Sequence, residues 1–411
     1  MPVAYDFIAI GGGAAGFFGA IAFAEARPGS RVAILEKTNS VLGKVKISGG
    51  GRCNVTHACF EPKPLTTRYP RGERSLIGPF HRWGAADTVE WFESRGVKLK
   101  TEADGRMFPV TNLSDTIIDC LMDAAEDAGI EILFRTDVES LVSDKSGIIL
   151  HLAGGGDLEA RSVLLATGGV RNGAGQKLAG ALGHTIIPAA PSLFTFKIDD
   201  SRLKDLAGVS VASVKAKIPG TALRSEGPCL VTHWGLSGPA ILKLSAWGAR
   251  ELSRCDYRFE VVIDWTPGLR SEALDETLSQ MREASPRKRI SSGVEGLTIP
   301  SRLWQKLVSA AGIDQTTTWS NLLREQRRAL VSQLTASTFR VEGKSTNKEE
   351  FVTAGGVELK EVNFKTMESK VVPGLHFAGE VLDIDGITGG FNFQAAWTTS
   401  KIAGESAAQR D

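Results

Sequence analysis

Three glycines near the start of the chain have the spacing of a dinucleotide-binding turn. Gly11, Gly13 and Gly16 directly follow a short apolar run and open an Ala-rich stretch. In such a turn Gly11 permits the tight bend, Gly13 lets a pyrophosphate approach the backbone, and Gly16 allows close packing of helix on strand. The chemistry that this spacing indicates is the binding of a nucleotide cofactor.

The elements around the turn are those that such a site needs. Residues 5–10 and 31–36 are apolar runs that predict buried strands, and residues 14–26 predict the helix between them. The first N–H groups of that helix, at Ala14 and Ala15, would face the phosphates. This order predicts the βαβ unit of a doubly wound sheet.

Glu36 ends the second of these strands, twenty residues after Gly16. A carboxylate at this position accepts hydrogen bonds from ribose hydroxyls. Strand, helix, strand and acid together favour a dinucleotide site over a glycine-rich packing turn, which is the alternative. An acid here serves the adenosine ribose of FAD and of NAD alike, so the choice of cofactor depends on the rest of the chain.

Two distant segments favour FAD, because an extended FAD needs contacts far from the first turn. Residues 164–169 and 374–380 are apolar runs that end in small or acidic residues suited to a cofactor, namely Thr167, Gly168, Gly169, Gly379 and Glu380. The Glu380 carboxylate would accept hydrogen bonds from ribityl hydroxyls. The sequence therefore predicts a second stretch of cofactor contacts near the C-terminus.

A further glycine-rich turn, residues 389–394, precedes the last predicted helix. N–H groups at the start of that helix would face the N1/O2 edge of a flavin and stabilise the negative charge of the reduced ring. Phe391 and Phe393 are aromatic residues that would shape the face of the flavin. A glycine-rich loop capping a core helix is the alternative interpretation of this region.

Five longer strings resemble those of the BaiN-like, or aminoacetone oxidase-like, family of FAD-binding proteins, also known as YhiN-type. They are residues 48–56 (SGGGRCNVT), 105–109 (GRMFP), 232–239 (THWGLSGP), 353–357 (TAGGV) and 378–386 (AGEVLDIDG). The likeness runs from Asp6 to Gly404. It implies a two-part FAD domain with an inserted β-barrel and a helical subdomain, and it links the chain to amine oxidation or to reduction of conjugated double bonds.

The resemblance also implies a set of FAD contacts. Those carried over residue by residue are Gly11, Gly13, Gly16, Glu36, Lys37, Gly43, Ser48, Gly49, Gly50, Gly51, Arg52, Cys53, Asn54, Gly168, Glu380, Gly389, Gly390, Phe391 and Asn392. Val138, on a predicted strand, is a weaker candidate that would pair with adenine through its backbone. The cysteine loop departs from the common family version after Thr56, where His57 and Cys59 follow.

The glycine-rich segments at the two ends of the chain enclose about 150 residues with different sequence patterns, which predicts an insertion. Alternating β-type segments over residues 209–263 give way to helical patterns from residue 269 to about residue 333. We therefore expect an FAD-binding domain from residues 1–190 and 346–411, an inserted β-barrel over 191–268 and a helical subdomain over 269–345.

Composition excludes several classes of function. The chain of 411 residues carries a formal net charge of +1, which gives no reason to expect a nucleic-acid or membrane-surface partner. There is no apolar run long enough for a membrane span and no signal-peptide pattern, so we expect a cytoplasmic protein. Five cysteines without zinc-type spacing predict neither a disulfide framework nor a metal.

Several sharper hypotheses remain open. His233, in a Gly- and Pro-rich loop, is a candidate proton donor or acceptor, with a hydrogen-bonded loop histidine as the equal alternative. Cys53 and Cys59 have a spacing one residue longer than that of flavin-linked disulfide reductases, and an active disulfide is the minority hypothesis. The basic stretch of residues 68–82 would attract an anion or form a solvated loop, and residues 286–289 (PRKR) predict a charged turn.

These features predict an FAD-dependent oxidoreductase that transfers a hydride at flavin N5 to or from a small organic substrate, either an amine or a conjugated double bond. NADH or NADPH is the candidate reductant. The alternative is a flavin-binding protein without turnover, acting as a sensor or an interaction partner.

Overall fold

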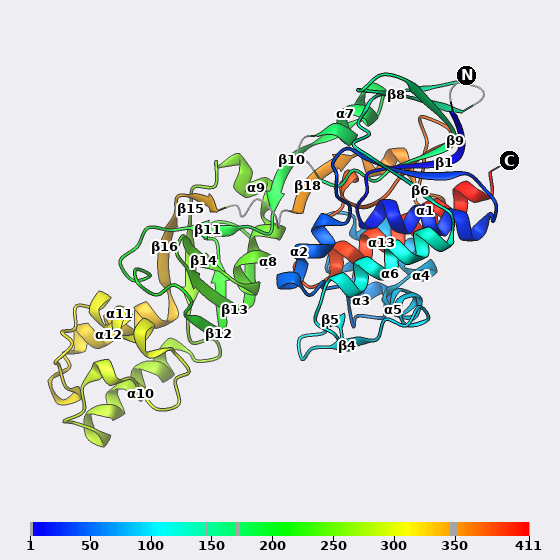
Figure 1. Cartoon of the computed structure of the whole chain (residues 1–411). Coiled ribbons are helices and arrows are strands. Elements are labelled where there is room, and N and C mark those ends of the chain that lie inside the picture. Colours follow the sequence, from blue (N-terminus) through cyan, green and yellow to red (C-terminus); the bar gives the residue numbers. More distant parts are fainter. Residues whose placement is uncertain (1–2, 145–146, 170–172, 346–351, 411) are drawn as a thin grey trace. The chain divides into compact units, whose positions relative to one another are not determined.

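The protein folds into two compact units (Figure 1). The computed structural model describes residues 3–144, 147–169, 173–345 and 352–410. The outer unit consists of Met1–Pro191 together with Lys348–Asp411, so it contains both ends of the chain, and the inserted unit is Ser192–Asn347. Each unit is described by itself below.

A largely parallel sheet forms the centre of the outer unit. Its five parallel strands lie in the order β21 (Leu375–Phe377), β9 (Asp157–Leu165), β1 (Val3–Ile10), β2 (Val32–Glu36) and β6 (Glu131–Phe134). Antiparallel strands extend it, namely β7 (Val138–Ser143), β8 (Ile148–Leu152), β19 (Val362–Asn363) and β20 (Glu368–Ser369). The strands predicted at residues 5–10 and 31–36 are confirmed.

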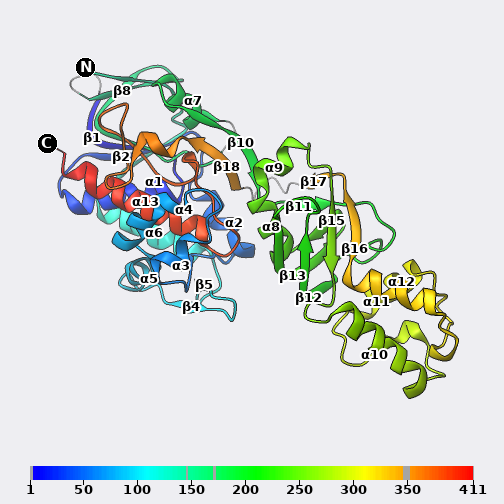
Figure 2. The same cartoon turned by 180° about the vertical axis from the view of Figure 1, so that it is seen from behind.

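Helices α1 (Ala14–Ala26) and α13 (Phe391–Ala408) pack against each other on one face of this sheet, with α6 (Asp115–Asp127) on the same face, as Figure 2 shows from behind. Two glycines permit the contact: a Cβ on Gly404 would lie 2.3 Å from the carbonyl oxygen of Gly19. Because the first helix of the fold packs on the last, the outer unit is complete only when the C-terminal segment has returned.

Short elements pack on the helices α13 and α6 of this unit, directly or through one another. They are α2 (Gly43–Gly51), α3 (Pro62–Thr66), α4 (Glu73–Arg82), α5 (Ala85–Glu93), the 3-10 helix η4 (Gly379–Val381) and a three-stranded sheet of β3 (Thr56–His57), β5 (Arg106–Pro109) and β4 (Leu99–Thr101). Where the chain leaves and re-enters the unit, β10 (Ile186–Ser192) pairs with β18 (Val352–Val357). Helix α7 (Ala174–Ala181) precedes β10.

The inserted unit has a seven-stranded antiparallel sheet in its described part. The strand order is β16 (Ser337–Val341), β15 (Phe259–Asp264), β12 (Ser210–Lys217), β13 (Arg224–Thr232), β14 (Gly235–Ser237), β11 (Thr195–Lys197) and β17 (Gly343–Ser345). Strands β16 and β17 lie within the segment 269–345, so the helical part ends before that segment does.

The helices of this unit form two groups. Helices α8 (Pro239–Trp247) and α9 (Ala249–Arg254) follow β14, whereas α10 (Ser271–Ala284), α11 (Ser301–Ala310) and α12 (Arg324–Thr335) gather beyond one end of β12, β15 and β16 (Figures 1 and 2). One hydrophobic core joins the strands to these helices and contains the fully buried Trp304 and Trp319. In the described part of the chain, no helix is long and apolar enough to cross a membrane.

Candidate functional site

The glycine turn lies between the ends of β1 and β9, where the strand order of the sheet reverses. A Cβ on Gly11 would lie 2.5 Å from the carbonyl oxygen of Ala166, and one on Gly16 would lie 1.9 Å from that of Gly11. Both positions therefore require glycine for packing. A Cβ on Gly13 would meet no atom within 4 Å, so the backbone there borders open space at the start of α1. In open α/β sheets, ligands bind at this switch point.

Glu36 supports the same turn from the end of β2. Its carboxylate accepts hydrogen bonds from the backbone N–H of Gly12 (3.0 Å) and of Thr38 (2.9 Å). The neighbouring Lys37 is exposed. Because the carboxylate is held beside the turn, it is positioned at the edge where a ribose would lie.

Val138 begins β7 close to this acid. The backbone N–H of Thr136, two residues earlier, donates to the carbonyl oxygen of Glu36 at 2.9 Å, and the Val138 side chain is buried. Its pairing with adenine stays a prediction.

The segment 48–54 forms a kinked loop that begins within α2 and continues beyond its end. Ser48 has an extended ψ of 149°, and Gly49, Gly50 and Gly51 have φ values of 59°, 71° and 82°. A Cβ on Gly50 or on Gly51 would meet no atom within 4 Å. The backbone N–H of Cys53 closes the loop on the carbonyl oxygen of Ser48 at 3.0 Å. The backbone at Gly50 and Gly51 therefore borders open space, as it does at Gly13.

Glu380 connects three segments that are far apart in sequence. Its carboxylate accepts from the backbone N–H of Gly169 at 3.1 Å and forms a salt bridge with Lys44 of α2. A Cβ on Gly168 would lie 3.9 Å from the same carboxylate. Gly379, just before it, approaches the methyl of Ala15 at the start of α1. The predicted contacts after β9 and after β21 therefore meet at one edge of the sheet.

The turn before α13 is fixed by two amides. With its amide oriented to satisfy both neighbours, Asn54 accepts from the backbone N–H of Gly390 (2.9 Å) and donates to the carbonyl oxygen of Thr56 (3.0 Å). Asn392 accepts from the N–H of Gly386 and donates to the carbonyl oxygen of the same residue. A Cβ on Gly390 would lie 2.5 Å from the carbonyl oxygen of Thr56, so this position requires glycine.

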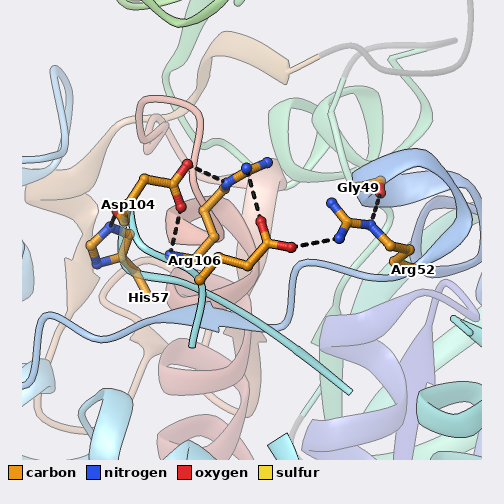
Figure 3. A network of polar contacts seen from close by, with 6 residues as sticks. Gly49, Arg52, His57, Asp104 and Arg106 are labelled. Atoms are coloured by element: carbon orange, nitrogen blue, oxygen red, sulfur yellow. Dashed lines mark hydrogen bonds and ion pairs between the residues drawn. The ribbon is translucent and has the colours of Figure 1, made fainter. Parts of the chain in front are cut away.

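An ionic network holds the 48–54 loop against the strand pair β4–β5, as Figure 3 shows. Glu102 accepts from Arg52 (2.6 Å) and from Arg106 (3.0 Å), and Arg106 also donates to Asp104 (2.7 Å). The guanidinium of Arg52 lies 4.0 Å from the ring centroid of Phe108. These contacts give the motif at residues 105–109 a structural role, because it fixes the loop that carries the glycines.

His57 lies at the other end of that network. Its Nε2 donates to the carbonyl oxygen of Asp104 at 3.0 Å, and its ring stacks on Phe391 with the centroids 4.7 Å apart. The hydroxyl of Tyr69 donates to the carbonyl oxygen of Phe391 at 2.6 Å. Phe391 is therefore held between the cysteine loop and the following helices, at the N-terminus of α13.

Two arginines of the basic stretch of residues 68–82 have acidic partners within the fold. Arg71 forms a bidentate salt bridge with the fully buried Asp385, and Arg82 pairs with Glu405 of α13 at 2.8 Å. The partners of these two residues are acids of the fold, whereas Arg68, Arg74 and His81 are exposed. The pairs tie the segment before α5 to the C-terminal part of the chain.

Cys53 and Cys59 are free thiols. Burial raises the pKa of Cys53 to about 12, and burial also raises the pKa of Cys59, against the opposing effect of Arg68. The thiolate is the nucleophile in disulfide exchange, so a raised pKa disfavours that chemistry.

His233 lies in the inserted unit, exposed on the turn between β13 and β14 beside Trp234, which is 57% exposed. The structure thus brings the predicted cofactor residues together in the outer unit and leaves the candidate catalytic histidine in the other. In the described ranges no group of three or more His, Cys, Asp or Glu side chains could hold a metal ion.

The geometry fits an extended dinucleotide. Open space lies over Gly13, Gly50 and Gly51, and the carboxylates of Glu36 and Glu380 stand near the ends of β2 and β21. The sequence missed Lys44, Tyr69 and Glu102 as members of this site. The sequence does show that Lys44 is a charged residue directly after the predicted contact Gly43. Its partner Glu380, however, is 336 residues away, so the pair could not be recognised.

A model of the "HI0933-like protein Rossmann domain" matches residues 5–406. The chain belongs to this family. The ribosomal RNA dihydrouridine synthase of Escherichia coli (strain K12) is 31% identical over 412 residues, which cover 96% of each chain. The 3-dehydro-bile acid delta(4,6)-reductase of Clostridium scindens is 29% identical over 409 residues, which cover 98% of each.

Solved structures share the fold of this HI0933-like chain. The 3-ketosteroid-delta4-(5alpha)-dehydrogenase of Rhodococcus jostii RHA1 has a TM-score of 0.54 at 17% identity, with 99% of this chain and 97% of that chain covered. A flavocytochrome c3 fumarate reductase has a TM-score of 0.52 at 19% identity, with coverages of 99% and 79%. The comparisons confirm the predicted family, the Rossmann-type fold, the FAD cofactor and the class of flavin-dependent oxidoreductase.

Proposed function

We propose that this protein is an FAD-dependent reductase of carbon–carbon double bonds that are conjugated with a carbonyl group. The observation that carries the cofactor assignment is the open backbone over Gly13, Gly50 and Gly51, at the same sheet edge as Glu36 and Glu380. When bound, FAD would supply two-electron chemistry: reduction of such a bond adds a hydride at the β-carbon and a proton, from a protein group or from water, at the α-carbon, and NADH or NADPH would be the source of the hydride.

The chain's own residues would bind and orient the cofactor. The turn of Gly11, Gly13 and Gly16 with the N-terminus of α1 would hold the pyrophosphate, and Glu36 and Glu380 would accept hydrogen bonds from its sugar and ribityl hydroxyls. The turn Gly389–Asn392, fixed by Asn54 and Tyr69, would present the N-terminus of α13 to the edge of the flavin where negative charge develops.

The choice of a double bond over an amine is supported by the names of the relatives. Dihydrouridine differs from uridine by two hydrogens across a C=C bond that is conjugated with a ring carbonyl. A delta(4,6)-reductase of a 3-keto bile acid saturates the same type of bond. The same reduction therefore applies to two substrate classes, a small enone and a uracil base in RNA.

His233 stays a candidate for the proton that reaches the α-carbon, since an imidazole titrates near neutral pH. The five cysteines are free thiols, which suits the predicted cytoplasmic location. The reductant is also part of the proposal, with NADH and NADPH as the two candidates.

Anaerobic half-reactions test the proposal. The purified protein, loaded with FAD, is titrated with NADH or NADPH until the flavin is bleached, and the reduced protein is then mixed with a small enone or a uridine-containing RNA. In a separate sample the oxidised protein is mixed with an amine. We expect reduction by a pyridine nucleotide and reoxidation by at least one conjugated double bond. Reduction of the flavin by amines, or a flavin that no donor reduces, would contradict the proposal; the second result supports a binding protein without turnover.

A further inference from the structure

The two units of the chain carry opposite net charge. Residues 192–347 contain 22 Lys and Arg against 16 Asp and Glu, whereas the remaining residues contain 26 against 31. The formal net charge of +1 for the whole chain is therefore the sum of a basic insertion and an acidic remainder. Charge asymmetry between parts of a chain is a signature of a polyanionic partner for the basic part.

Six basic residues of the insertion form what we call the basic surface. They are Arg282 in the last turn of α10, Arg287, Lys288 and Arg289 in the segment that follows, and Arg324 and Arg328 on α12. All six are exposed. Residues 286–289 are the short basic run visible in the sequence.

Backbone pairing brings the two halves of this surface together. The segment after α10 runs antiparallel to residues 317–320: the N–H of Ser320 donates to the carbonyl oxygen of Pro286, and that of Trp319 donates to the carbonyl oxygen of Lys288. Arg289 forms an isolated bridge with Thr318. Four residues after Ser320 the chain reaches Arg324 at the start of α12, and α12 packs on α10, the helix that precedes the basic loop.

Buried aromatic side chains hold this arrangement in place. Trp319 is fully buried in the core of the inserted unit, and Trp304 of α11 donates from its indole N–H to the carbonyl oxygen of Ile290 at 2.7 Å. The basic loop is therefore fixed by tertiary contacts on both sides. On α12, Arg324 and Arg328 are four residues apart, a spacing that puts them on one face of the helix.

The six cations have no hydrogen-bond or ion-pair partner within the residues that the structure describes, in contrast to other arginines of the same unit. Arg327 pairs with Asp275 at 2.8 Å and Arg202 pairs with Asp200 at 2.7 Å. Within residues 282–289 and 324–328 the exposed acids are Glu283 and Glu325, and Glu272 and Glu276 are exposed nearer the start of α10. Within these two segments the six cations therefore exceed the exposed acids by four. The side chains of the basic surface are available to a ligand because they are not used by the fold.

We propose that the basic surface binds the phosphate backbone of RNA and thereby selects RNA as the substrate, an inference that rests on the proposed reduction of a uracil double bond. Five of the six residues are arginines, whose planar guanidinium forms bidentate hydrogen bonds with phosphate. Contacts of this kind supply most of the affinity for nucleic acids without reading the sequence.

Binding of a fluorescent RNA hairpin to the full-length, FAD-loaded protein tests the proposal. With about five phosphates contacted, the dissociation constant should rise with salt with a log–log slope of roughly 4. The variant R287E/K288E/R289E should bind the hairpin at least about 30-fold more weakly, with a smaller slope. A variant R324E/R328E should weaken binding in the same direction.

The control replaces three exposed lysines of the outer unit, K63E/K98E/K365E, which makes the same change in net charge. Equal loss of RNA binding in this variant would overturn the assignment, because the effect would then follow total charge. Unchanged binding in both surface variants would also overturn it. Retention of the flavin absorbance shows that each variant is folded.

Two further arms separate the remaining explanations. Poly-glutamate replaces RNA as the ligand: binding as tight as that of the hairpin would overturn the RNA assignment in favour of an acidic protein partner. Reduction of a small enone is measured on the same variants. If RNA binding is lost and enone reduction persists, both proposals stand; if the wild type binds RNA but reduces no double bond, the proposed function fails and the surface stands as a binding site.

Discussion

The arginines that fix the cofactor loops of the outer unit and the basic surface of the inserted unit differ in what they touch. In the outer unit, Arg71 lies against the fully buried Asp385 and Arg52 lies against Glu102 and Phe108, whereas in the inserted unit the six residues of the basic surface extend into solvent. Paired charges fix the loops that carry the cofactor glycines, and unpaired charges remain available to a partner. The difference indicates a division of labour, with cofactor chemistry in the outer unit and substrate selection in the inserted unit.

The largest effect is expected from breaking the buried pair. Arg71→Ala leaves the Asp385 carboxylate buried without its main cation, which typically costs about 3–5 kcal/mol of stability. The matched change in the inserted unit, Arg327→Ala, removes a partly exposed pair with Asp275 and should cost no more than about 1 kcal/mol. Denaturant unfolding of both variants measures the difference.

Equal destabilisation by the two substitutions would contradict the contrast between the units. Asp385→Asn together with Arg71→Ala should recover part of the loss, because the buried negative charge is then absent.

The next effect concerns the open backbone at the glycine turn. Gly13→Ala should raise the dissociation constant of FAD about 100-fold, since the added methyl fills space that the pyrophosphate needs. The apoprotein should keep its melting temperature, because Gly13 has a φ of −95° that alanine also adopts. Gly78→Ala, where a Cβ likewise meets no atom within 4 Å, is the control. FAD titrations that give equal affinities for both variants would refute this assignment.

A smaller effect depends on pH. Burial lowers the pKa of His376 in β21 to about 4, with the carboxylate of Glu368 acting in the opposite direction. As the pH falls below 6.5, the ordinary pKa of histidine, His376 binds a proton in the unfolded chain but stays neutral in the folded chain. The free energy of unfolding therefore decreases toward pH 4. The slope from this residue is about 1.4 kcal/mol per pH unit.

His376→Gln should flatten this dependence. Urea unfolding of the wild type and the variant at several pH values between 4 and 7 measures it, and parallel curves would show that His376 is not the group responsible.

The smallest effect is a lack of reactivity. Cys53 is buried with a raised pKa, whereas Cys255 of the inserted unit is exposed. Iodoacetamide followed by mass spectrometry should label Cys255 in the native protein and Cys53 only after denaturation. Fast labelling of Cys53, or the release of two extra thiols after anaerobic reduction, would revive the hypothesis of an active disulfide.

The parts of the site that the sequence predicted are those in which cause and effect are local. The turn from Gly11 to Gly16 and the acid at Glu36 follow from one βαβ unit, because spacing alone fixes their positions. The long insertion was predicted as well, since its β-type and helical patterns lie between the glycine-rich segments of the two ends.

The remaining parts depend on contacts between distant residues. The pairs Arg71–Asp385 and Lys44–Glu380 join residues 314 and 336 positions apart, and no local pattern indicates them. The strand β3 has only two residues, too few for a periodicity. The short run of residues 286–289 predicted only a charged turn, because its backbone pairing with residues 317–320 cannot be recognised in the local sequence.

The division of labour is tested most directly by reoxidation of the anaerobically reduced flavin in the variant R287E/K288E/R289E. Each sample is mixed with RNA or with a small enone, and the return of the visible flavin absorbance is followed against the wild type. We predict that reoxidation by RNA slows at least about 30-fold while reoxidation by the enone changes less than about twofold. Equal slowing of both reactions, or no slowing with RNA, would contradict the account.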